Sequence, residues 1–387
     1  MSEFSNKALL PAGMCDVLPP DAEIEASSTE QLIACFSGNG YERVKPPLIE
    51  FEESLLTGSG AAMSAQTFRM MDPVSQQMMG VRADMTLQVA RIATTRLKKS
   101  PRPLRLCYGG QVLRVRGTQM RPERQFGQVG AELIGSREPQ ADAEVILLAV
   151  ESLNALGITD LSIDLALPTL IPAVIANLNL GEDCAASLRA ALDRKDEAAV
   201  KGLAEKLGEN ASNQLTALLR ATGPAEPALA ALAKLELPEE AIHERAKLGT
   251  VIDKIRAGAP DLNLTVDPVE SRGLEYHTGV TFTVFAGNVR GELGRGGRYI
   301  AGGNSSDEGE PATGMSLFMD SVLRALPTTV QGKRLYVPTE TDIAKARKLR
   351  AEGWVTVDGL VKRANAQVEA KRLGCSHFLS DDQIQDI

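Results

Sequence analysis

Residues 113–133, LRVRGTQMRPERQFGQVGAEL, concentrate side chains that can bind charged groups. Arg114 and Arg116 alternate with apolar residues, and Arg121 and Arg124 follow in a polar loop. Four arginines this close together are typical of a site for an anion such as a phosphate, or of a solvated hairpin. For the two loop arginines three roles stay open: contact with a partner, phosphate binding and solvation of the loop.

Gln128 and Glu132 lie in the second alternating run of this stretch. A period of two places them on one face of a predicted strand, together with Phe126 and Gly130. A carboxylate in such apolar surroundings is costly unless it is paired. A bound ammonium or imidazole could supply that pairing, and Gly130 would leave room for the ligand. The alternative is a structural ion pair between Glu132 and one of the arginines.

A second candidate is the stretch ESRGLEYHTGV, residues 270–280. Alternation places Arg272 and Tyr276 on one face of a predicted strand and His277 on the other. Arg272 could clamp a carboxylate with two parallel hydrogen bonds, or it could be an ordinary arginine on an edge strand.

A third candidate, Asp84 and Thr86, comes directly before a predicted helix. A short polar side chain at this position most often caps the first turn, and binding of an ammonium group by Asp84 is the alternative. The glycine-rich run at residues 290–303 lacks the lysine and the setting of a phosphate-binding loop, so it predicts only tight turns and close backbone approach.

The chain of 387 residues has 43% hydrophobic and 24% charged residues and a net charge of −8, which is typical of a soluble globular protein of two or three domains. Its apolar runs are too short to cross a bilayer, and the N-terminus lacks the apolar core of an export signal. The five cysteines are scattered and the three histidines lie far apart. We therefore expect no disulfide framework, no metal site and a cytoplasmic location. The net charge also disfavours tRNA as a partner.

The elements that must position these residues follow from periodicity and breakers. Asp21 is the predicted N-cap of a first helix, and Asp72-Pro73 is the predicted turn of a hairpin within residues 67–86. The other expected elements are helices at 22–36, 87–99 and 140–158 and strands at 41–51, 104–116 and 123–136. The Pro46-Pro47 pair is expected to end the first of these strands, because proline donates nothing to a ladder.

The composition changes between residues 181 and 257, where aromatic residues vanish and Ala, Leu, Glu and Lys recur at helical spacing. We interpret this segment as a helical insertion into a core made of residues 1–180 and 258–326. Strands return after it, followed by a predicted helix at 314–326. From Pro327 to the end, short strands and helices alternate, which predicts a small α/β domain at 327–387.

The order of these motifs resembles the class II aminoacyl-tRNA synthetases, and within them histidyl-tRNA synthetase. The resemblance is carried by LPAGMCDVLPP, VRADMT, the stretch from residue 113 to 135, SRGLEYHTG and GGRY. Apart from the helical insertion it spans about residues 8 to 325. It implies an α+β fold in which an antiparallel sheet is flanked by helices.

The resemblance also implies a pocket for free histidine. In that family an acidic residue, a threonine and a glutamine hold the α-amino group, a strand glutamate and the second signature tyrosine read the imidazole, and the signature arginine faces the α-carboxylate. His277 stands where the family has that second tyrosine. The implied histidine-binding residues are Asp84, Thr86, Gln128, Glu132, Arg272, Tyr276 and His277.

The nucleotide side departs from the family pattern. Arg114 stands where the family has its phosphate-binding arginine, but Arg116 replaces a glutamate beside the adenine. The family's third motif ends in Glu-Arg, and its arginine grips the γ-phosphate; here Asp320 and Ser321 stand in those two places. Losing that cation leaves the negative charge of ATP uncompensated. We therefore regard Arg114 and Arg116 as a remnant of nucleotide handling and expect no catalytic residue.

A kept amino-acid pocket, a broken ATP site and a C-terminal domain shorter than the family's anticodon-binding domain together resemble the histidyl-tRNA synthetase-like regulatory subunits of ATP phosphoribosyltransferase. That resemblance implies a non-catalytic protein that binds L-histidine as effector. It would assemble, as a homodimer within a larger hetero-oligomer, with a short-form catalytic subunit, without cofactor, tRNA or membrane. The alternative is a working histidine–tRNA ligase.

Overall fold

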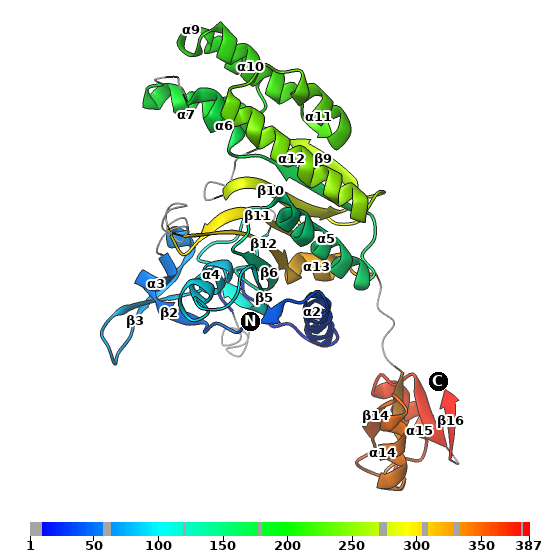
Figure 1. Ribbon diagram of the computed structural model, residues 1–387. Coiled ribbons are helices and arrows are strands. Elements are labelled where there is room, and N and C mark those ends of the chain that lie inside the picture. The colour runs from blue at the N-terminus through cyan, green and yellow to red at the C-terminus, as the bar shows by residue number, and fades with distance from the viewer. Residues whose placement is uncertain are drawn as a thin grey trace, which may run out of the picture. The chain divides into compact units, whose positions relative to one another are not determined.

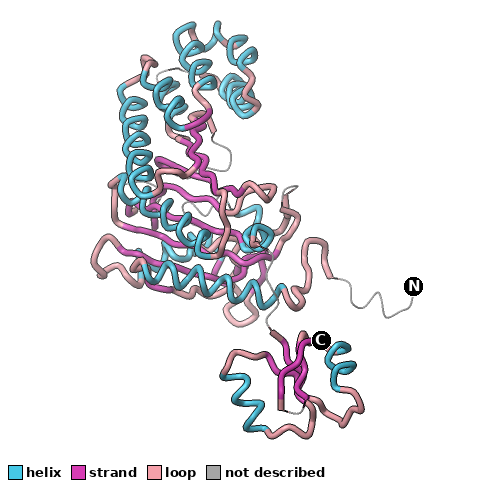
Figure 2. The backbone as a smooth tube through the Cα atoms, turned by 90° about the vertical axis from the view of Figure 1, so that its right-hand side faces the viewer, coloured by secondary structure: helices cyan, strands magenta, loops and turns pink. Residues whose placement is uncertain are grey.

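The computed structural model describes residues 10–56, 63–118, 121–176, 178, 180–270, 277–303, 309–327, 333–380 and 382–387. The chain divides into two compact units, Met1–Leu326 and Pro327–Ile387, both drawn in Figures 1 and 2. Each unit is described by itself.

A nine-stranded sheet organises the first unit, with the strand order β1-β5-β6-β12-β11-β10-β7-β9-β8. In this spatial order, each neighbouring pair from β5 through β6, β12, β11 and β10 to β7 is antiparallel. Near the two edges, β1 pairs parallel with β5 and β9 pairs parallel with β7. The strands are β1 (Glu42–Arg43), β5 (Leu104–Leu113), β6 (Gln125–Ile134), β7 (Leu161–Ala166), β8 (Gly223–Pro224), β9 (Asn263–Asp267), β10 (His277–Ala286), β11 (Gly294–Ala301) and β12 (Glu310–Phe318). A mostly antiparallel sheet flanked by helices confirms the predicted α+β class (Figure 2).

Two hydrophobic cores lie on the two faces of this sheet. Val129, Ala131 and Leu133 of β6 pack on one face with α2 (Asp21–Gly38) and α5 (Pro139–Ala155). Phe126 and Ile134 of the same strand pack on the opposite face with α4 (Thr86–Thr95). The predicted period of two along β6 is therefore confirmed, and it directs Gln128 and Glu132 toward the α4 side.

The helical segment is continuous with the first of these cores, because its apolar side chains belong to the same cluster. Its helices are α6 (Leu170–Ile175), α7 (Glu182–Asp193), α8 (Glu197–Gly202), α9 (Ala204–Leu207), α10 (Glu209–Arg220), α11 (Ala225–Ala233) and α12 (Glu239–Gly258) (Figure 1). The helical content expected for 181–257 is present, interrupted by the short strand β8. Its boundaries as an inserted domain stay a prediction.

A smaller sheet of three strands carries the predicted hairpin. In it β2 (Ile49–Phe51) and β3 (Phe68–Met71) both pair with β4 (Met78–Val81), and the short helix α3 (Glu52–Leu56) follows β2. The predicted turn at Asp72-Pro73 lies directly after β3 and is confirmed.

One predicted helix is wrong in its limits. The helix expected at 314–326 begins only at α13 (Met319–Ala325), because Gly314–Phe318 completes the buried strand β12 between β6 and β11. The helix signal of this apolar run is overridden by pairing on both sides. The strand expected within 41–51 does end before Pro46-Pro47, as β1, and a second strand, β2, begins after the prolines.

Other limits move by a few residues. Asp21 is not an N-cap: Pro20 holds that position, and Asp21 is the first residue of α2, where a carboxylate suits the helix dipole. The strand expected at 104–116 ends at Leu113, and the helix expected at 87–99 runs from Thr86 to Thr95.

The second unit is a small α/β structure with hydrophobic clusters of its own. Its sheet has the order β14-β13-β15-β16. The elements are β13 (Arg334–Val337), α14 (Ile343–Ala351), β14 (Val355–Asp358), α15 (Ala366–Arg372), β15 (His377–Ser380) and β16 (Gln383–Asp386). Among the described residues, no helix combines the length and apolarity needed to cross a membrane.

A buried ion pair fastens α5 to the sheet. The Arg298 guanidinium on β11 lies 2.7 Å from the Asp142 carboxylate on α5, and it also donates to the carbonyl oxygens of Ser136 and Glu138. Both charged side chains are largely buried. Each charge is therefore tolerated only because the other is present.

We predict that Arg298→Met lowers the free energy of unfolding by about 3–5 kcal/mol, because it leaves the Asp142 carboxyl buried without its cation. Urea unfolding followed by circular dichroism measures the change. The double variant Arg298→Met/Asp142→Leu is the control and should recover most of the loss. A single variant as stable as the wild type would contradict the account.

Candidate functional site

Four predicted site residues meet where β6 passes the start of α4. Gln128 and Glu132 lie on β6, and their side chains are buried. Asp84 and Thr86 lie at the N-terminal end of α4, and both remain partly exposed. The structure therefore brings together residues that are more than 40 positions apart in sequence, at one place on the α4 face of the sheet.

Glu132 is 0% exposed. The hydroxyl of Tyr108 donates to its Oε1 at 3.1 Å, and the hydroxyl of Tyr299 donates to its Oε2 at 2.9 Å. Within the described part of the chain no arginine pairs with this carboxyl, so the ion pair offered as an alternative is not found there. Burial raises the pKa of Glu132 to about 8, and the nearby Asp84 charge acts in the same direction.

The two carboxylate oxygens of Asp84 accept hydrogen bonds from different residues. Its Oδ1 accepts the backbone N–H of Thr86, the first residue of α4, at 2.8 Å. The predicted capping role is wrong, because Met85 holds the N-cap position and no side chain there caps the first turn. Its Oδ2 accepts from the Gln128 side-chain amide at 3.1 Å. The same amide donates to Ser316 Oγ at 2.7 Å, and its oxygen accepts the Met85 N–H at 2.9 Å. Gln128 is held from both ends and in turn holds Asp84 in place.

Tyr108 connects this group to Glu132. Its hydroxyl lies 3.1 Å from the Thr86 hydroxyl and 3.1 Å from the Ser316 hydroxyl, and it donates to Glu132. Burial raises the pKa of Tyr108 well above its usual value, so the phenol stays a donor. A continuous chain of hydrogen bonds therefore runs from the partly exposed Asp84 to the buried Glu132.

Two glycines form a floor beside Glu132. Gly314 on β12 pairs with Gly297 on β11, and Glu132 pairs with Gly314 from the other side. A Cβ at Gly314 would overlap the Glu132 carboxylate, and a Cβ at Gly297 would lie 2.9 Å from Cδ2 of His277. The space above Gly314 is therefore filled by the Glu132 carboxylate, and that above Gly297 by Thr281 and His277.

The space predicted at Gly130 is not available to a ligand. A Cβ at Gly130 would overlap the ring and hydroxyl of Tyr108, which already fills that position. Tyr108 pairs with Gly130 across the β5–β6 ladder, so this glycine admits the tyrosine instead.

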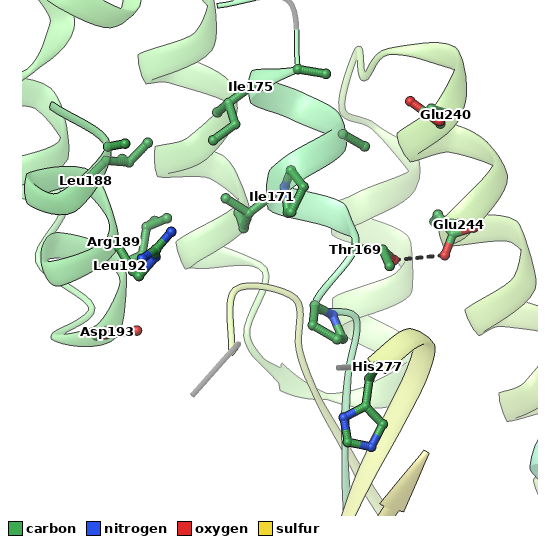
Figure 3. A pocket seen from close by; sticks show the side chains of 15 residues that line it. Thr169, Ile171, Ile175, Leu188, Arg189, Leu192, Asp193, Glu240, Glu244 and His277 are labelled. Atoms are coloured by element: carbon green, nitrogen blue, oxygen red, sulfur yellow. Dashed lines mark hydrogen bonds between the residues drawn. The ribbon is translucent and has the colours of Figure 1, made fainter. Parts of the chain in front are cut away.

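His277 begins β10 and is buried. It also lies at the base of a cavity of about 680 Å³ between α6, α7 and α12 (Figure 3). Ile171, Ile175 and other apolar side chains form one wall of this cavity, and Thr169 donates to Glu244 at 2.8 Å on the other. Arg272 and Tyr276, the other two predicted members of the signature, lie outside the described residues.

The nucleotide-side residues line another cavity, of about 460 Å³. Arg114 and Arg116 lie on its wall, and so does Arg121. Arg121 is only 8% exposed, so solvation of the loop is the wrong role for it. Arg124 donates to the carbonyl oxygens of Arg114 and Ala12, and this fixes the N-terminal segment to the loop.

Sequence reasoning missed Tyr108, Tyr299, Ser316 and the two floor glycines. Tyr299 belongs to the GGRY run, which entered the resemblance without a role for its tyrosine. The others depend on the register of four strands. Among the described residues, no group of three or more His, Cys, Asp or Glu side chains could hold a metal ion.

A sequence model of the histidyl-tRNA synthetase family matches residues 13–322. The chain is 58% identical to the ATP phosphoribosyltransferase regulatory subunit of Paramagnetospirillum magneticum, with 100% of each chain covered. It is 34% identical to the protein of that name from Ectopseudomonas mendocina, over 96% of this chain and 95% of the relative.

Solved structures share the fold. A Bacillus halodurans protein described as an ATP phosphoribosyltransferase regulatory subunit/histidyl-tRNA synthetase matches with a TM-score of 0.80 and 24% identity, covering 94% of this chain and 96% of that one. Histidyl-tRNA synthetase from Nostoc matches with a TM-score of 0.78 and 20% identity, covering 96% and 90%. The predicted class II synthetase-like fold is confirmed. The chain belongs to the family of ATP phosphoribosyltransferase regulatory subunits, whose fold is that of the histidyl-tRNA synthetases.

Proposed function

We propose that this protein is a non-catalytic regulatory subunit that binds L-histidine and acts on a short-form ATP phosphoribosyltransferase catalytic subunit in the first step of histidine biosynthesis. The name of its relatives supports the enzyme complex. The observation that supports histidine as the effector is the buried Glu132 carboxyl, which ends a hydrogen-bonded chain starting at Asp84.

Glu132 has the chemistry to recognise an imidazole. A histidine ring titrates near pH 6.5 and this carboxyl near pH 8, so at neutral pH both are mainly uncharged. One proton shared between them makes a strong hydrogen bond without burying net charge. Gly314 adds no side chain beside this carboxylate, and in this proposal His277 lies near the ring, as the resemblance implies.

The α-amino group fits the other end of the hydrogen-bonded chain. Asp84 keeps a partly exposed carboxylate with Thr86 beside it, and the Gln128 amide N–H holds that carboxylate in place. An ammonium group donates hydrogen bonds, and in this proposal Asp84 and the Thr86 hydroxyl accept them while Gln128 positions Asp84. In this proposal Arg272 faces the carboxylate, as the resemblance implies, and Tyr276 belongs to the same pocket.

The absence of catalysis is part of the proposal, and the nucleotide side supports it. Asp320 and Ser321 stand in place of the motif's Glu-Arg, and Arg116 reverses a charge. In the described part of the chain, Asp320 pairs with Arg121, 3.0 Å away, and with Arg324. Arg121 itself points to protein atoms rather than to open solvent.

Feedback would then be a coupling between histidine and the catalytic partner. Such couplings are typically worth about 1–3 kcal/mol and are reciprocal, so histidine affinity must change when the partner binds. A homodimer inside a larger hetero-oligomer and a cytoplasmic location complete the proposal. All five cysteines are free thiols, which suits a reducing compartment.

We predict that isothermal titration detects binding of L-histidine and that Glu132→Gln weakens it by about 2–10-fold, because a hydrogen bond between uncharged groups is worth about 0.5–1.5 kcal/mol. L-alanine, which lacks the ring, should not compete. Glu144→Gln is the matched control: Glu144 also accepts from a tyrosine, Tyr41, but belongs to α5. Unchanged affinity in Glu132→Gln would remove Glu132 from the site.

We also predict that the unliganded protein loses stability between about pH 4.5 and about pH 8, relative to Glu132→Gln. In this range the folded state keeps a proton on Glu132 that the unfolded chain has released, so raising the pH favours unfolding. At about 1.4 kcal/mol per pKa unit, the loss is at most about 5 kcal/mol. Urea unfolding at a series of pH values measures it, and parallel curves for the two proteins would contradict the raised pKa.

A third prediction separates the proposal from a histidine–tRNA ligase. With histidine present, the protein should catalyse no ATP–pyrophosphate exchange, because the γ-phosphate cation is lost. Mixed with a short-form catalytic subunit, it should increase phosphoribosyl transfer, and histidine should inhibit the mixture. Glu132→Gln should keep the activation and lose the inhibition. Exchange at enzymatic rates would establish the ligase instead.

A further inference from the structure

The cavity of about 460 Å³ on the nucleotide side has an unusual charge. Five arginines and two glutamates line it, although the whole chain carries a net charge of −8. Positive charge is therefore concentrated at one place on an acidic protein, which is the electrostatic condition for drawing in an anion. The charged lining residues are Arg114, Arg116, Arg121, Arg290, Arg295, Glu123 and Glu292.

Most of these guanidinium groups are not neutralised within the described part of the chain. The side chains of Arg116, Arg290 and Arg295 make no hydrogen bond or ion pair there, and that of Arg114 donates only to the Ala83 carbonyl oxygen. Burial lowers the pKa of Arg114; the Asp84 and Glu292 charges raise it, and the neighbouring Arg295 and Arg121 charges lower it. Repulsion among these like charges raises the free energy of the unliganded protein, and a bound anion would relieve it.

Arg121 is different, because it is satisfied by the protein. Its guanidinium lies over the Phe318 ring, 3.8 Å from the centroid, and 5.2 Å from the centroid of Phe126. It donates to Asp320 at 3.0 Å and to the Ser321 hydroxyl at 3.4 Å. The Arg121 cation thus covers the face of the Phe318 ring and closes that face to a flat base.

Phe318 is buried behind Arg121. Its ring is 1% exposed and meets Phe126 edge to face, with centroids 5.9 Å apart. Neither ring is among the described residues that line the cavity, whereas Arg121 is. Arg121 therefore separates both rings from the arginine-lined space.

We propose that this cavity binds a compact phosphate-bearing anion without a base, such as pyrophosphate or a sugar phosphate, and that Arg121 excludes nucleotides from it. Guanidinium groups suit phosphate oxygens because they offer paired donors and keep their charge. The ligand class differs from the ATP of a ligase, since the base has no place to stack. The inference does not depend on histidine being the effector.

The test titrates the full chain with inorganic pyrophosphate by calorimetry, and in parallel with adenosine and AMP. We expect pyrophosphate to bind and to weaken as the salt concentration rises, while adenosine and AMP show no heat or at least about tenfold weaker binding. Arg295→Ala and Arg116→Ala should each weaken pyrophosphate by about tenfold or more. Arg189→Ala is the control, because Arg189 is an exposed arginine that lines the other cavity.

Arg121 is tested by the double variant Arg121→Ala/Asp320→Asn, which removes the buried carboxylate together with its cation. It should admit AMP, and adenosine should then compete with AMP. If the double variant does not fold, Arg121→Leu/Asp320→Leu gives the second reading, because it also removes both buried charges and keeps the Phe318 ring. AMP excluded from whichever of these variants folds would overturn the role of Arg121.

Three results would contradict the proposed anion site. Absence of pyrophosphate binding to the wild type at millimolar concentration would overturn it, as would equal losses in Arg189→Ala and Arg295→Ala. Adenosine or AMP binding to the wild type as tightly as pyrophosphate would overturn the exclusion of the base. A histidine titration of the same samples separates these outcomes from failure of the proposed function.

Discussion

The removal of one carboxyl group from water determines the arrangement of the site. Glu132 is fully buried, and burial raises its pKa to about 8. Such a group is stable only where donors are fixed around it. Tyr108 and Tyr299 supply them from two different strands, and Gly314 makes room for the carboxylate. The local features of β5, β6, β11 and β12 follow from this single requirement.

How far the sequence predicts this site depends on how local each contact is. The period of two correctly placed Gln128 and Glu132 on one face of β6, because side-chain direction along a strand is a local property. The predicted cap at Asp84 was wrong by one position, because Met85 is the N-cap and Asp84 accepts from the first helical residue, Thr86. Tyr108 and Gly314 could not be predicted, because their contacts with Glu132 depend on the register between separate strands.

The larger errors have the same physical origin. Residues 314–318 have a composition that a helix accepts, but hydrogen bonding to two neighbours makes them a strand. Arg121 lies in a polar loop and was expected to be solvated, yet two aromatic rings and Asp320 bury it. In both cases the neighbours that decide the outcome are distant in sequence, so no local pattern could have indicated them.

Strand β12 contacts the proposed histidine site with one end and packs behind the arginine-lined cavity with the other. Gly314 lies against Glu132, Ser316 accepts from Gln128, and Phe318, four residues after the glycine, stacks with Arg121. Contiguity alone is not coupling, because coupling requires an element with two arrangements that both ligands bias. A rigid strand shared by both sites does set a limit: a shift of β12 caused at one end cannot leave the other end unchanged. Any effect of a ligand on one side upon affinity at the other must then be equal in both directions.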